Sequence, residues 1–396
     1  MATVNDVKPK SAVLTEEILR RCHERAAGYD RDNRFFDEDF QELKDAGYLL
    51  MAVPEKFGGL GMNLAQAMRE TRRLAYHAPA TALALNMHIY WTGLCADVWR
   101  SGDSSVDWLL EEAGKGEVFA AGHAESGNDI PVLLSTTKAE RVDGGYRFTG
   151  RKSFGSLTPV WTRLGMHGMD TRDPENPKVV HAFLQRDSEG YEIVDVWDSL
   201  GMRATQSQDT VLNGAFVPDS YIARVIPAGL GGADLFILGV FMWALTGFAN
   251  VYYGIAKRAF DIVVESVKEK SSIALSRPMA HHPEVQHGVS EMRLILDSIE
   301  PQIETLANNW SNGVEGRNYA SDVVSSKYTA TEGAFRAVDI AVDLAGGFAI
   351  NKRSELERLF RDARLGRIHP ANSALTHELL AKFALGLDPD DPQRWG

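Results

Sequence analysis

A histidine in the segment RIHPANSAL (367–375) is the first candidate for chemistry in this sequence. The ordinary pKa of histidine is about 6.5, so His369 can give or take a proton near neutral pH. Pro370 disfavours a helical backbone at the residue before it, which predicts an extended His369 with an aimed ring. Asn372 has two interpretations: it caps the helix that follows, or it contacts a ligand.

Two further histidines are candidates for proton transfer, His88 in LNMHIYW and His123 before AESGND. His88 lies in an apolar helical stretch, so a hydrogen-bonded core histidine is an equally good interpretation. For His123 both interpretations also stay open. The segment HHPEVQH (281–287) does not predict a metal site, because Pro283 divides it and a spacing of five places His282 and His287 on different faces of a helix. We therefore expect no metal.

Aromatic residues and one methionine accompany these histidines, and they form either a substrate pocket or ordinary core. We expect about half of them to be core. The pocket candidates are Tyr90, Trp91, Phe236, Phe241, Met242 and Trp243.

The elements that must position these residues follow an order of helices, short strands and helices. Helical spacing predicts a helical domain over 1–116 and a second over 229–396. Between them, 117–228 has period-two alternation and a hairpin signal at Asp143-Gly144-Gly145. The sequence thus predicts an α+β fold of three domains.

Composition excludes several classes of function. The net charge of −12 argues against a nucleic-acid or anionic-membrane surface. The longest apolar run, 235–249, falls short of the roughly 20 residues that span a bilayer, so it predicts a buried helix. Two cysteines, Cys22 and Cys95, favour free thiols, and the first ten residues lack an apolar signal segment, so we expect a cytoplasmic protein.

Four segments together carry a family resemblance: AVPEKFGGLG (52–61), SLGMRATQSQDTVLNGAFVP (199–218), DLAGGF (343–348) and RLFRDARLGRI (358–368). In this order and spacing the chain resembles the acyl-CoA dehydrogenase superfamily over nearly its whole length. The resemblance implies an N-terminal helical domain, a central β-barrel-like domain and a C-terminal four-helix bundle. It also implies a flavin between the last two, and a homo-oligomer, either a dimer or a tetramer.

The resemblance assigns flavin contacts residue by residue. Phe154 and Ser156, in GRKSFGSLTPVW, stand where the family has a tryptophan on the flavin and a hydroxyl near its N5. FAD is the predicted cofactor, with FMN as the alternative. Without the resemblance, Gly346 and Gly347 are more typical of a helix C-cap than of a cofactor site. The remaining cofactor-binding candidates are Ser126, Arg277, Gly346, Gly347 and Asn372.

The residues that a dehydrogenase of this family needs are missing. Its catalytic carboxylate usually stands where this chain has Pro370, and no acidic residue occurs from 235 to 257. The positions that bind the CoA portion are occupied by Met242 and Leu245. A thioester substrate would therefore find neither a base nor its usual anchor.

The chain is similar instead to the flavin monooxygenase branch, which includes dibenzothiophene monooxygenase and the oxygenase components of two-component phenol and indole hydroxylases. This implies reduced flavin from a separate NAD(P)H-dependent reductase, O2, and hydroxylation of a hydrophobic, aromatic substrate. Ser156, His369, His88 and His123 are then the catalytic candidates. Two alternatives stay open: an acyl-CoA dehydrogenase with a relocated base, such as His369, and a non-catalytic flavin-binding subunit.

Overall fold

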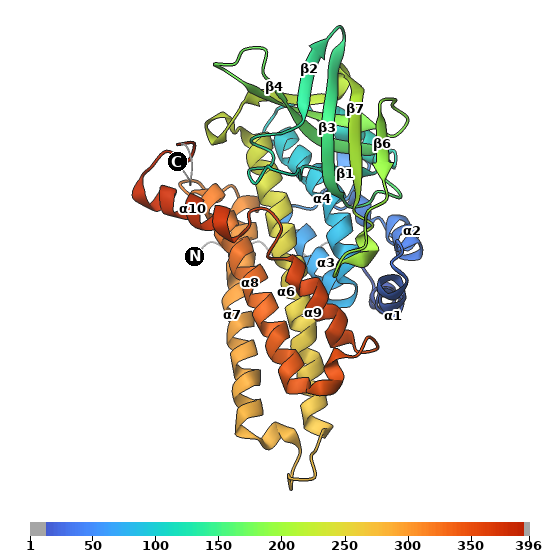
Figure 1. Cartoon of the computed structure of the whole chain (residues 1–396), viewed down its shortest axis with the longest axis vertical. Helices are drawn as coiled ribbons and strands as arrows, with labels where there is room; N and C mark the ends of the chain where they lie inside the picture. Colours follow the sequence, from blue (N-terminus) through green and yellow to red (C-terminus); the bar gives the residue numbers. More distant parts are fainter. Residues whose placement is uncertain (1–12, 392–396) are drawn as a thin grey trace, which may run out of the picture.

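The computed structural model describes residues 13–391, which form three regions along the chain (Figure 1). Helices come first, one eight-stranded sheet follows, and long helices complete the chain. The changes occur between Gly114 and Phe119 and between Pro227 and Leu235. The fold is therefore α+β, with a β-domain between two helical regions.

The N-terminal region places α4 against the sheet and the bundle. Asn63 and Gln66 form a reciprocal capping box that begins α3, and Pro79 opens α4 at a position where its missing N–H breaks no helical bond. Most of α4 is buried. The elements are α1 (Glu16–Asp32), α2 (Asp37–Asp45), η1 (Tyr48–Leu50), η2 (Glu55–Phe57), α3 (Leu64–His77), α4 (Pro79–Arg100) and α5 (Asp107–Gly114).

The strands form one mixed sheet in the order β6-β7-β3-β2-β4-β5-β8, with β1 parallel to β4. The predicted hairpin is present: Val142 pairs with Gly145, and Gly144 takes the positive φ (76°) that its turn requires. The strands are β1 (Phe119–Gly122), β2 (Lys138–Val142), β3 (Gly145–Gly155), β4 (Arg163–Asp170), β5 (Lys178–Gln185), β6 (Tyr191–Val194), β7 (Gln208–Pro218) and β8 (Ile222–Pro227). Short 3-10 turns follow at η3 (Arg203–Thr205), η4 (Asp219–Tyr221) and η5 (Leu230–Gly232).

In the C-terminal region α6 to α9 run side by side below the sheet, and α10 lies near their upper end (Figure 1). The Asp234 side chain caps the first turn of α6 by accepting the Ile237 N–H. The elements are α6 (Leu235–Glu269), η6 (Met279–His281), α7 (Pro283–Ser311), α8 (Tyr319–Ala345), η7 (Gly347–Ile350), α9 (Glu355–Leu365) and α10 (Ser373–Leu385).

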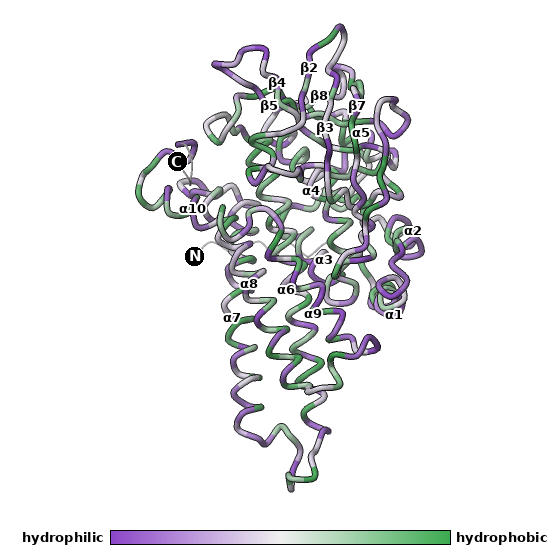
Figure 2. Tube along the Cα trace, in the orientation of Figure 1, coloured by the Kyte–Doolittle hydropathy of each residue, from purple (hydrophilic) through white to green (hydrophobic). Residues whose placement is uncertain are grey.

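The apolar run predicted as a buried helix is the first half of α6. The helix is long and apolar enough to cross a membrane by composition, but 83% of its most apolar window is buried inside the protein. Figure 2 shows hydrophobic colour along this helix and hydrophilic colour on the loop between β4 and β5. At Gly93 of α4 a Cβ would lie 2.3 Å from the Trp243 ring, so this close helix contact requires glycine. We conclude that α6 is the core helix of the molecule.

Candidate functional site

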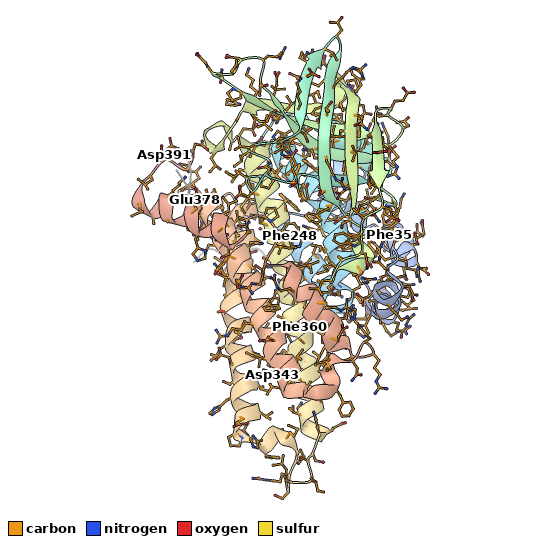
Figure 3. All side chains as sticks on the ribbon, in the orientation of Figure 1. Phe35, Phe248, Asp343, Phe360, Glu378 and Asp391 are labelled. Atoms are coloured by element: carbon orange, nitrogen blue, oxygen red, sulfur yellow. The ribbon has the colours of Figure 1, made fainter. Side chains whose placement is uncertain are left out.

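A cavity of about 300 Å³ lies where α4, the β-domain and the bundle meet. Its volume is at the lower end of the range for small-molecule sites. We call the lining residues between 121 and 207 the β wall, and those of 240–248 and 365–372 the bundle wall. Leu83, Met87 and Tyr90 of α4 close the third side. Phe248 of the bundle wall is labelled in Figure 3, at mid-height, where the bundle meets the rest of the protein.

The β wall presents Ser156 on a sharp turn at the end of β3. Phe154 and Leu157 on either side of it have φ values of 60° and 68°. The Ser156 N–H donates to the Phe154 carbonyl at 2.9 Å. The turn aims the Ser156 hydroxyl and the Phe154 ring, which is 58% exposed, at the same cavity.

Non-glycine residues with positive φ are concentrated around this cavity. Six non-glycine residues within 13–391 have them, and five of the six line the cavity or adjoin a lining residue: Val132, Phe154, Leu157, Met202 and Gln206. Each such conformation costs on the order of 1–3 kcal/mol and persists where the surrounding structure enforces it. Strain of this kind is typical of a functional site.

The loop that carries Met202 is anchored by the bundle. The buried Asp362 carboxylate accepts the Met202 N–H at 2.5 Å, and Arg361 donates to the Leu200 carbonyl at 3.0 Å while pairing with Asp30. Burial raises the pKa of Asp362 to about 6. The RDAR segment therefore holds the β wall to the bundle, a role that sequence analysis did not assign to it.

His369, a catalytic candidate from the sequence, lies on the bundle wall. Its Nε2 lies 2.8 Å from the Tyr252 hydroxyl, and its ring stacks on Phe248 with 4.6 Å between centroids. Within residues 13–391, the Tyr252 hydroxyl has no hydrogen-bond partner other than this nitrogen, so we assign Tyr252 as the donor and the ring hydrogen to Nδ1. Burial, and then the charge of Lys327, lower the pKa of His369 to about 3. The ring is therefore neutral at pH 7.

Lys327 of α8 holds the backbone beside His369. Its buried ammonium group donates to the carbonyl oxygens of His369 at 2.8 Å and Ala371 at 3.0 Å. Burial lowers the pKa of Lys327 to about 7, against a small opposing effect of Glu332. Sequence analysis missed this residue, although its position on the inner face of a helix is an unusual place for a lysine.

His123 lies half-buried on the β wall and begins a column of three histidines, of which His167 and His181 are fully buried. Its Nδ1 is 3.5 Å from the Tyr90 hydroxyl, and its buried Nε2 has no partner within residues 13–391. His167 follows at 5.2 Å and His181 at 5.8 Å between ring centroids. Burial lowers the pKa of all three, that of His181 to about 3. Neither the Nδ1 of His167 nor either nitrogen of His181 has a partner in this part of the chain.

Two carboxylates, Glu125 and Asp129, line the cavity, and both belong to the β wall. Glu125 accepts from Lys152 Nζ at 2.6 Å and from the Thr137 hydroxyl and amide. Burial opposes its ionisation, but Lys152 and these hydrogen bonds hold the pKa of Glu125 at about 2. With this low pKa, Glu125 does not act as a base at neutral pH. The bundle wall has no carboxylate at all.

Several predicted residues lie outside the cavity lining. His88 Nε2 faces the Leu49 carbonyl at 2.9 Å, and His88 Nδ1 accepts the Phe119 N–H. Both ring nitrogens are therefore hydrogen-bonded to backbone groups in the core. Trp91 and Phe236 are buried, with Trp91 donating to the Ala120 carbonyl. Met242 and Trp243 lie on the other face of α6 from Phe241, which does line the cavity together with Tyr90.

The predicted cofactor residues divide in the same way. Phe154, Ser156 and Asn372 line the cavity, and Asn372 also caps α10 by accepting the Leu375 N–H. Ser126 is exposed and outside the lining. Gly346 ends α8 with φ 77°, the C-cap interpretation, and Gly347 follows it. These glycines adjoin Asp343, which Figure 3 labels low on the bundle, and Arg277 is exposed beyond α6.

The cavity suits the ring system of a flavin. Phe154 offers an aromatic face, Ser156 a hydroxyl and His123 an unpartnered buried Nε2, a mixture of apolar and hydrogen-bonding groups that a flat heteroaromatic ring can satisfy. The wall opposite, on α6, is apolar, with Val240, Phe241, Ala244 and Leu245. The residues present therefore fit the ring system of a flavin.

Comparisons with known proteins agree with this geometry. The model "Acyl-CoA dehydrogenase, N-terminal domain" matches residues 12–104, and "Acyl-CoA dehydrogenase, C-terminal domain" matches 246–374. "Putative acyl-CoA dehydrogenase YdbM" of Bacillus subtilis (strain 168) is 27% identical over 92% of this chain and 94% of its own length. L-evernosamine nitrososynthase of a Micromonospora species is 26% identical over 96% of this chain and 90% of its own. The crystal structure of a nitrososynthase from Micromonospora carbonacea var. africana superposes with a TM-score of 0.81 at 24% identity, covering 94% of this chain and 95% of that one.

Proposed function

The chain belongs to the acyl-CoA dehydrogenase family of flavin-dependent oxidoreductases, and from that premise we propose that it is a monooxygenase rather than a dehydrogenase. The single observation that carries the proposal is the bundle wall. A dehydrogenase needs a carboxylate there to remove a proton from its thioester, whereas this wall offers a neutral histidine and apolar side chains.

When bound, reduced flavin supplies the two electrons with which one atom of O2 enters the substrate and the other leaves as water. The residues of the chain would bind the flavin and orient the substrate. Phe154 would offer its ring to the flavin, Ser156 would hold the flavin by a hydrogen bond near N5, and His369 would orient a polar group of the substrate through its Nδ1–H. The apolar side chains of α4 and α6 exclude water from the reacting atoms.

The substrate we propose is small, hydrophobic and aromatic. Tyr90, Phe241 and Phe248 supply aromatic faces, while Met87 and Leu245 supply aliphatic ones. The similar nitrososynthase acts on an amine by its name, but here the bundle wall offers no anion to a protonated amine. A primary amine added to the substrate panel of the test below would distinguish an amine substrate from an aromatic one.

For the cofactor we propose FAD, with an NAD(P)H-dependent reductase supplying it reduced, and a cytoplasmic location. Arg277, Gly346 and Gly347 are outside the cavity lining, so we propose that they contact a flavin held in the cavity of a second copy. We therefore also propose a homo-oligomer; a protein that takes FMN alone does not need this contact.

The test compares two reactions of the purified protein. With photoreduced FAD and O2, we expect hydroxylated product from a panel of phenols and indoles, measured against hydrogen peroxide release. In the parallel anaerobic experiment, acyl-CoA thioesters of different chain lengths should leave the visible band of bound oxidised flavin unchanged. Bleaching by any acyl-CoA would contradict the proposal and favour a dehydrogenase with a relocated base.

A further inference from the structure

Three hydroxyl groups form a continuous chain behind the β wall. Ser156 Oγ lies 2.7 Å from Ser207 Oγ, and Ser207 Oγ lies 2.7 Å from Thr205 Oγ1. Thr205 Oγ1 then lies 2.8 Å from the carbonyl oxygen of Met202. All three side chains are buried, so these short contacts are the hydrogen bonds by which the hydroxyls are satisfied.

The Met202 carbonyl at the end fixes the direction of every bond in this chain. A carbonyl only accepts, so Thr205 donates its one hydroxyl hydrogen to it. Ser207 must then donate to Thr205, because Thr205 has no hydrogen left. For the same reason Ser156 must donate to Ser207. The Ser156 oxygen is left with lone pairs alone, and toward the cavity it can only accept a hydrogen bond.

We propose that Ser207 and Thr205 are specificity-determining positioning residues, which make Ser156 an acceptor so that the site selects reduced over oxidised flavin. This rests on the proposed function, which places Ser156 at flavin N5. Reduced flavin carries a hydrogen on N5 and can donate to Ser156, whereas N5 of oxidised flavin carries only a lone pair. Two lone pairs facing each other leave both groups without a partner in a buried site.

The backbone strengthens this fixed polarity. Met202 and Gln206, which flank the Arg203–Thr205 turn, both have positive φ, and the Met202 N–H is held by Asp362. The carbonyl that terminates the chain is thus held in place from the bundle. Without Ser207 the Ser156 hydrogen is free to turn into the cavity, and the hydroxyl can then donate to N5 of oxidised flavin.

The experiment measures the dissociation constants of the protein for oxidised and photoreduced FAD, by anaerobic equilibrium dialysis. In the native protein we expect reduced flavin to bind more tightly, and Ser207→Ala should lower this preference by about threefold to tenfold, the usual value of one net hydrogen bond. The change should come mainly from tighter binding of oxidised flavin. Ser207→Thr keeps the hydroxyl and should restore the native preference.

Matched variants separate this role from a general loss of structure. Thr158→Val removes a neighbouring hydroxyl that donates to the Gly155 carbonyl outside the chain, and it should leave the preference unchanged. Ser156→Ala should make a further Ser207→Ala change silent, because Ser207 acts through Ser156. An unchanged preference in Ser207→Ala that still binds flavin would overturn the inference while leaving the proposed function intact. Failure of the native protein to bind either form of flavin would instead overturn the proposed function, and this inference with it.

Discussion

The two walls of the cavity position their polar groups in different ways. On the β wall, Ser156 is held by a strained turn and by the uncharged hydroxyls of Ser207 and Thr205, which fix the orientation of its own hydroxyl hydrogen. On the bundle wall, His369 is held by one phenol, one stacked ring and one buried lysine that binds its backbone. The β wall therefore orients the Ser156 hydroxyl without a charged group, whereas the bundle wall positions His369 with the buried ammonium group of Lys327. The three hydroxyls themselves do not titrate near neutral pH, whereas Lys327 does.

The largest effect should come from Lys327→Met, which removes the two donors to the His369 and Ala371 carbonyls. The Ala371 carbonyl keeps the Thr376 hydroxyl as a donor, so the His369 carbonyl is the one left unpaired. An unpaired buried carbonyl costs about 1–3 kcal/mol, and the free energy of unfolding should fall by about that amount. Chemical denaturation measures this. If the variant keeps native stability and native product formation, Lys327 does not hold the bundle wall.

The same lysine gives the bundle wall its pH dependence. The pKa of Lys327 is about 7 in the folded protein and near 10.5 when unfolded, so between these values the unfolded chain binds more protons. Stability should therefore rise as pH increases through this window, by up to about 1.4 kcal/mol per pH unit. Denaturation at several pH values should show this rise in the native protein and its loss in Lys327→Met.

On the β wall, Ser156→Ala should uncouple O2 consumption from the formation of hydroxylated product. A buried hydrogen bond worth about 1–3 kcal/mol corresponds to a roughly tenfold to hundredfold change in a rate, so hydrogen peroxide release should increase by that factor. Total flavin binding should change far less. Peroxide electrodes and product chromatography give the ratio, and equal coupling in variant and native protein would remove Ser156 from the mechanism.

The histidine column behind the β wall should make the protein sensitive to acid. The pKa of His181 is about 3 in the folded protein against about 6.5 unfolded, so between these values the unfolded chain binds one more proton and stability falls as pH decreases. His181→Phe removes two unpartnered nitrogens and should lessen the acid loss by up to about 1.4 kcal/mol per pH unit. An unaltered pH profile would show that His181 is satisfied in solution by bound water.

The smallest effect should follow Tyr252→Phe. This change leaves the ring in place but releases His369 Nε2, so the histidine is free to change tautomer. We expect product formation to fall by about threefold to tenfold, the value of one hydrogen bond, with coupling unchanged. A fall in coupling instead would mean that the bundle wall also controls oxygen use.

Sequence alone located the groups whose role depends on local chain geometry. Pro370 marks the turn that brings His369 to the cavity, and the GRKSFGS segment places Ser156 at the end of a strand. The order of helices and strands and the hairpin at Gly144 follow from periodicity and turn residues for the same reason. These features depend on residues a few positions apart.

Tertiary structure decided everything that depends on the rotation of a helix or on pairing across the chain. Met242 and Trp243 are as aromatic or apolar as Phe241, yet both lie outside the cavity lining, and the Trp243 ring packs against Gly93 of α4 instead. His88 lies in the core and not in the cavity lining, because its two ring nitrogens are hydrogen-bonded to the backbone at Leu49 and Phe119.

The residues that sequence analysis missed are all joined to the site over long separations. Tyr252 is 117 residues from His369, Lys327 is 42 residues from it, and Ser207 is 51 residues from Ser156. No local pattern encodes such contacts, because they form only when separate elements pack and each buried donor must find an acceptor. The sequence thus fixed which chemical groups are present at the turns, and the packed structure decided which of them meet and which way each hydrogen bond runs.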